Sequence, residues 1–138
     1  MAEDWTRARF PDVPAEAGHY ESYYLKACKP GEPLGVWIRY TVHKRPGAEP
    51  NGSLWFTLFS AGGPHAAKVT LPGPAAPDGE LITVGEASFA PGRVAGEALD
   101  CSWQLEFEGP ADPFLHLRSA DPHQVRAELL RKAAVHRR

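Results

Sequence analysis

Two short β-prone runs, separated by a Pro-Gly turn, constrain the fold of this chain more than any other feature. The runs cover residues 19–27 and 34–43, and both are rich in tyrosine, tryptophan and other strand-forming residues. Pro30 and Gly31 lie between them and supply the backbone geometry of a turn. The two runs are therefore predicted to form a β-hairpin.

The rest of the chain repeats this pattern of short runs broken by glycine and proline. These two residue types make up 27 of the 138 residues (13 Gly and 14 Pro), which excludes a helix bundle and favours many turns. Further strands are predicted at residues 53–59, 65–71, 81–84, 87–90 and 101–108. In residues 53–59 both odd and even positions are apolar, as in a strand covered on both faces. In residues 101–108 apolar and polar residues alternate, as in a strand with one buried face. About seven short strands predict a mainly β fold, an antiparallel partial barrel or sandwich.

Three segments complete the predicted organisation around one β domain at residues 19–117. Residues 1–18 form a leader segment without regular structure, and residues 43–52 form a loop that ends in an Asn-Gly turn signal. Residues 118–138 carry an N-cap signal at Asp121 and apolar residues at helical spacing. A short C-terminal helix is predicted there.

Charge and cysteine usage limit the classes of partner and compartment. The net charge is −2, so the chain as a whole does not attract nucleic acid or a membrane surface. Residues 118–138 contain six basic and two acidic residues, a net of +4, which fits a solvated helix or an anionic partner. No apolar run approaches the roughly 20 residues of a membrane span, and the first residues lack the basic-then-apolar pattern that predicts a signal peptide. Cys28 and Cys101 are isolated and are predicted to be reduced thiols in a cytoplasmic protein.

Residues 17–115 resemble a family of lipocalin-like proteins that includes carotenoid hydratase (hydroxyneurosporene synthase), tocopherol cyclase and the AttH proteins. The resemblance rests on the run His-Tyr-Glu-Ser-Tyr-Tyr-Leu-Lys-Ala at 19–27, the Trp-Ile-Arg-Tyr core of 34–41, Trp55-Phe56, residues 87–93 and the strand through Trp103. It implies a barrel-like domain that handles isoprenoid or polyketide-like molecules. Members usually have two tandem halves, and this chain matches the N-terminal half only, so the resemblance implies a truncated or frame-disrupted member.

The charged residues of the predicted hairpin are candidates for the polar end of a pocket. If Glu21 lies opposite Arg39, then Tyr23 lies opposite Trp37 on the same face. Arg39 would bind a ligand headgroup, and Glu21 would act as a general acid with a raised pKa if the protein is a hydratase or cyclase. The alternative is that Glu21 and Arg39 form a structural cross-strand ion pair or an exposed pair on a solvated sheet face.

The aromatic residues have two interpretations. Trp37, Trp55 and Trp103, together with Tyr23, are predicted to line a ligand pocket, or else they fill the core of a small β domain. The six histidines are scattered along the chain, so no metal site is predicted, and no sequence motif for a cofactor is present.

Three functions are consistent with these features. The first is binding of a small lipophilic molecule, isoprenoid or polyketide-like, in a barrel-type pocket. The second is hydration or cyclisation of such a molecule through protonation by Glu21. The third is a homodimeric interaction module that pairs through an open sheet edge.

Overall fold

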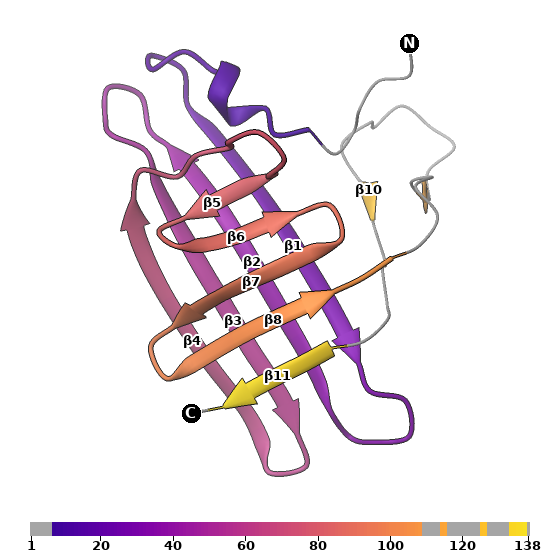
Figure 1. Ribbon diagram of the computed structural model, residues 1–138. Coiled ribbons are helices and arrows are strands. Elements are labelled where there is room, and N and C mark those ends of the chain that lie inside the picture. The colour runs from indigo at the N-terminus through magenta and orange to yellow at the C-terminus, as the bar shows by residue number, and fades with distance from the viewer. Residues whose placement is uncertain (1–6, 109–113, 116–124, 127–132, 138) are drawn as a thin grey trace.

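The computed structural model describes the backbone and side chains of residues 7–108, and the backbone of residues 114–115, 125–126 and 133–137. Two antiparallel sheets dominate it (Figure 1). The first has four strands that pair in chain order: β1 (His19–Cys28), β2 (Gly35–Lys44), β3 (Asn51–Ser60) and β4 (Gly63–Pro72). The predicted hairpin and the two strands after it are therefore confirmed.

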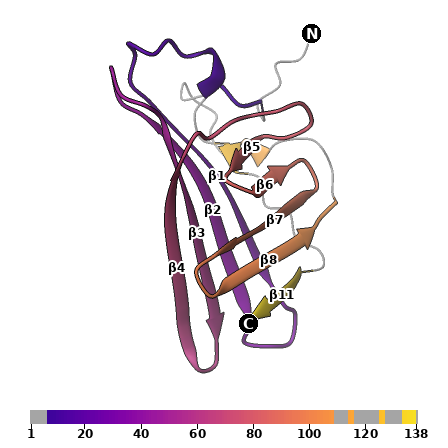
Figure 2. The ribbon, with the colours of Figure 1, turned by 60° about the vertical axis from the view of Figure 1, so that its left-hand side comes forward.

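The second sheet lies across one face of the first (Figures 1 and 2). Its strands follow the order β11-β8-β7-β6-β5, with the bounds β5 Ile82–Val84, β6 Ala87–Ala90, β7 Arg93–Ala98, β8 Cys101–Glu106 and β11 Ala133–Arg137. A small separate pair consists of β9 (Phe114–Leu115) and β10 (Val125–Arg126), and a 3-10 turn, η1 (Phe10–Asp12), precedes β1. The mainly antiparallel β fold is confirmed, as a sandwich whose sheets do not close into a barrel.

The core lies between the two sheets and follows the period-two alternation of the strands. In β8, Cys101, Trp103 and Leu105 are buried while the residues between them are more exposed, as the sequence predicts. The largest fully buried side chains come from both sheets: Tyr40, Phe56, Ile38, Leu54, Ile82, Val42, Val84 and Val94. Burial of each Val, Leu, Ile or Phe side chain among them stabilises the fold by about 1.5–3 kcal/mol.

The register of the first hairpin differs from the predicted one. Glu21 pairs with Val42, and Arg39 pairs with Tyr24, so the predicted pairing of Glu21 with Arg39 is wrong. The register differs by three residues, and any odd shift moves side chains to the opposite face of a strand. Burial of Tyr40 and its alternate neighbours against the second sheet determines this register, and Arg39 faces away from the core.

β3 is not covered on both faces. Leu54 and Phe56 face the core, whereas Phe59 is 50% exposed on the opposite face. The second sheet covers only one side of the first (Figure 2), so the expectation of a doubly covered strand is wrong. The Asn-Gly turn signal is also misleading, because Asn51 and Gly52 begin β3.

The predicted C-terminal helix is wrong wherever the segment is described. Residues 125–126 and 133–137 are the strands β10 and β11, and β11 pairs with β8 along its whole length. Asp121, the predicted N-cap, lies outside the described residues.

β7 was not predicted from the sequence, and it completes the pairing between β6 and β8.

Candidate functional site

The residues predicted to form a ligand site are divided among three parts of the fold. Trp37, Arg39 and Trp55 lie on the face of the first sheet that is turned away from the second sheet. Arg39 donates a hydrogen bond to the hydroxyl of Tyr20 (2.8 Å), and the ammonium of Lys68 lies 4.1 Å from the centroid of the Trp55 ring. These three residues are on an open sheet surface and do not form the wall of an interior pocket.

Glu21 and Tyr23 anchor the segment before β1. The Glu21 carboxylate accepts hydrogen bonds from the backbone N–H groups of Arg9 (3.0 Å) and Phe10 (2.8 Å) and from the Tyr23 hydroxyl (2.7 Å). Its Oε2 also lies 3.1 Å from Nε2 of His19. The carboxylate therefore holds the 3-10 turn η1 against β1, and the side chain of Phe10 is buried there.

The surroundings of Glu21 do not suit a proton donor. Burial by itself would raise its pKa, but the hydrogen bonds from Tyr23, the two backbone N–H groups and His19 outweigh that effect, so its pKa is lowered. The raised pKa expected for a hydratase or cyclase is therefore not found. The hydrogen bonds favour the ionised form of Glu21, and its role in the fold is to hold the segment before β1.

Trp103 lies in the core. It is 3% exposed, and its indole ring stacks on Phe56 with ring centroids 5.3 Å apart. Its Nε1–H donates a hydrogen bond to the hydroxyl of Tyr40 (3.0 Å). Of the two interpretations of the tryptophans, core packing holds for Trp103.

A groove of about 470 Å³ opens between the two sheets, beside β4 and the β5–β6 turn. It is lined by Leu54, Leu71, Val84, Gly85, Glu86, Ala87, Gly96 and Glu97. None of the residues predicted to bind a ligand lies in this lining. Because the lining comes from five strands of both sheets and the turn between two of them, no local pattern in the sequence marks it.

The groove has mainly apolar walls, and its charged lining residues are both glutamates. Leu54, Val84 and Ala87 are buried and present aliphatic side chains to it, while Glu86 and Glu97 are exposed. Such a surface favours an aliphatic molecule, and its two carboxylates disfavour an anionic headgroup. This groove is the candidate ligand site.

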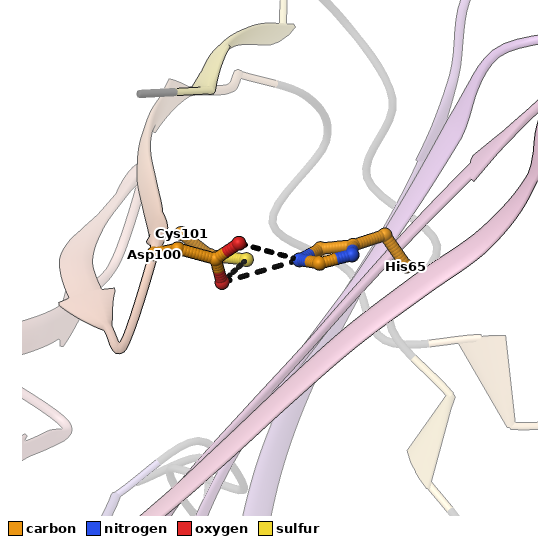
Figure 3. A group of neighbouring side chains, drawn as sticks. All are labelled: His65, Asp100 and Cys101. Carbon is orange, nitrogen blue, oxygen red and sulfur yellow. Dashed lines mark hydrogen bonds and ion pairs between the residues drawn. The ribbon is translucent and has the colours of Figure 1, made fainter.

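A second constellation joins the two sheets away from the groove. His65 on β4 meets Asp100, in the turn between β7 and β8, and Cys101 at the start of β8 (Figure 3). The hydrogen bond with His65 lowers the pKa of Asp100. His65 and Asp100 are 35 residues apart and only sheet packing brings them together, so no spacing in the sequence marks this group.

Comparisons with known proteins identify no relative. No protein-family model matches the chain, and neither the curated proteins nor the solved structures contain a significant match. Within the part of the chain that the structure describes, no helix has the length and apolar character needed to cross a membrane. The function is therefore inferred from the geometry of the sites.

Proposed function

We propose that this protein binds a small, mainly aliphatic molecule in the groove between its two sheets. The observation that carries the proposal is the groove itself, whose volume of about 470 Å³ falls within the range of roughly 300–1,000 Å³ usual for ligand sites. The proposal agrees with the lipophilic ligand expected from the sequence, but it moves the ligand to different residues.

The chemistry of the groove narrows the class of ligand. Leu54, Leu71, Val84 and Ala87 offer aliphatic contacts, and no aromatic ring lines the groove for stacking. Glu86 and Glu97 are its charged lining residues. A neutral or cationic molecule with a branched aliphatic chain, such as an isoprenoid alcohol or amine, fits these features better than a fatty acid.

Native mass spectrometry of the purified full chain tests this function directly. We expect a co-purified apolar mass of a few hundred daltons, or one equivalent of added farnesol as the probe, to remain bound under gentle ionisation. Calorimetric titration with farnesol and with lauric acid then compares a neutral and an anionic chain. Equal binding of both compounds would contradict the role of the acidic lining, and no binding of either would contradict the groove as a site.

Two matched variants locate the site. Leu71→Trp fills the groove from β4, whereas Ala66→Trp adds the same side chain to the opposite face of the same strand. Leu71 is only partly buried, so the larger tryptophan side chain can be accommodated without unfolding the protein. Circular dichroism checks that the variant is folded. We expect farnesol binding to be lost in Leu71→Trp and kept in Ala66→Trp, and the reverse result would exclude the groove.

Pairing through a sheet edge is a second candidate function, favoured by the length of the edge strands. β1 and β4 are both ten residues long, and in the described part of the chain each pairs with a strand on one side only. Long open edges are templates for adding another strand. Light scattering over a wide concentration range should then show a dimer, and a monomer throughout would exclude this function.

A further inference from the structure

Three side chains with different metal-binding atoms converge where the two sheets meet. The imidazole Nε2 of His65 lies 3.1 Å from Oδ1 and 3.0 Å from Oδ2 of Asp100, and the Cys101 thiol donates a hydrogen bond of 3.5 Å to Oδ1. One ligand atom from each residue lies within 4.8 Å of the other two (Figure 3). The group therefore offers one nitrogen, one oxygen and one sulfur ligand in a small volume.

This donor set matches the preferences of zinc. Zn²⁺ is bound by Cys sulfur at about 2.3 Å, His nitrogen at about 2.0–2.1 Å and carboxylate oxygen at about 2.0–2.2 Å. Two ligands of one tetrahedral ion are then separated by roughly 3.3–3.8 Å. The separations of 3.0–3.1 Å between His65 and Asp100 and of 3.5 Å between Asp100 and Cys101 lie close to this range. The nitrogen of His65 and the sulfur of Cys101 lie within 4.8 Å of each other, so side-chain movements would admit an ion.

The backbone presents these groups from both sheets. His65 lies on the face of β4 that is turned toward the second sheet, and its side chain is 33% exposed. Ala98 pairs with Cys101, so Leu99 and Asp100 form a two-residue turn in which Leu99 has a φ of 54°. Non-glycine residues rarely adopt this backbone conformation, and Leu99 is 78% exposed, so its side chain gains nothing from burial there. The turn directs the Asp100 carboxylate toward His65.

We propose that His65, Asp100 and Cys101 bind a Zn²⁺ ion that links the first sheet to the second. Cys101 is buried, whereas the side chain of Asp100 is 56% exposed, so the ion is reached from the solvent side. Three protein ligands leave the fourth tetrahedral position for a water molecule or an external ligand. This site is separate from the groove, because the two share no lining residue.

Cobalt substitution tests the ligand set, since Co²⁺ occupies zinc sites and reports a bound thiolate by a charge-transfer band in the near ultraviolet. We expect the full chain to bind one equivalent of Co²⁺ with this band, and Zn²⁺ to displace it. Cys101→Ser should remove the band. Cys28→Ser is the matched control, because Cys28 is exposed at the end of β1 and should leave the band unchanged.

Two further variants guard against misfolding of Cys101→Ser, whose side chain is buried. His65→Gln and Asp100→Asn change more exposed residues, and each should weaken Zn²⁺ binding by more than about tenfold. Zn²⁺ should also raise the melting temperature of the wild type more than that of either variant. Absence of the band in the wild type would overturn the proposal. Loss of the band in Cys28→Ser but not in Cys101→Ser would also overturn it, because Cys28 would then be the thiolate ligand.

Discussion

The indole N–H of Trp103 donates a hydrogen bond to the hydroxyl of Tyr40, 3.0 Å away, across the two sheets in the middle of the core. The Tyr40 hydroxyl in turn donates to the backbone carbonyl of Ala95 on β7 (2.8 Å). Buried polar groups are costly unless they are hydrogen-bonded. This chain of two hydrogen bonds therefore permits polar groups in the core and fixes how the sheets pack.

Replacing Tyr40 by phenylalanine should destabilise the fold. Tyr40→Phe removes the acceptor of the Trp103 N–H and the donor to the Ala95 carbonyl, which should cost about 1–3 kcal/mol. Urea unfolding measures the difference. Tyr24→Phe, on the exposed face of β1, is the matched control and should change the free energy of unfolding by less than about 0.5 kcal/mol. Equal effects of the two substitutions would show that the core hydroxyl is not important.

The same tyrosine predicts a loss of stability at alkaline pH. Burial raises the pKa of Tyr40 far above its usual value near 10, although the Trp103 hydrogen bond opposes this. The folded protein keeps the proton at a pH where the unfolded chain releases it, so this contribution is complete below about pH 10 and falls as the pH rises further. We expect the free energy of unfolding to decrease above pH 10, and less steeply in Tyr40→Phe. Parallel pH profiles would contradict the shift.

Glu21→Gln should destabilise the protein at neutral pH and have less effect in acid. The lowered pKa of Glu21 means that its stabilising contribution is present above the pKa of the unfolded chain and is lost as pH falls through the folded pKa. We expect a cost of about 1 kcal/mol at pH 7, from weaker hydrogen bonds to the segment before β1. Urea unfolding at several pH values measures it, with the exposed Glu16→Gln as control. A cost that grows in acid would show that Glu21 is protonated in the folded state.

Gly96→Ala should disturb the packing beneath the groove. A Cβ atom at this position would lie 2.6 Å from the Cβ of Ala87 and 2.7 Å from the Trp103 ring, so the core must shift. Overpacking of this kind costs about 1–3 kcal/mol. At Gly62 the nearest atom to an added Cβ, the Ser60 hydroxyl, is 3.9 Å away, so Gly62→Ala should have little effect on stability. Thermal unfolding of both variants measures the difference. A similar loss in both variants would show that the close contacts at Gly96 are not the cause, because the lower chain entropy of alanine acts in the stabilising direction.

Local patterns in the sequence determined where most strands lie. Glycine and proline separate the runs, and period-two alternation identifies the buried residues of β8, because both effects depend on neighbouring residues only. The same local reasoning failed at residues 125–126 and 133–137, where apolar spacing suggested a helix. Residues 125–126 pair with β9 instead. Residues 133–137 pair with the edge of β8, which is about 30 residues away in the sequence.

Only the tertiary structure decided where the site residues lie. The register of β1 against β2 placed Arg39 on the outer face, because burying Tyr40 between the sheets is more favourable than burying a charge. The packing of one sheet across the other created the groove and brought His65 to Asp100. Local sequence patterns thus locate most of the strands. The neighbours of each side chain depend on long-range pairing and sheet packing, because those contacts join segments that no local pattern connects.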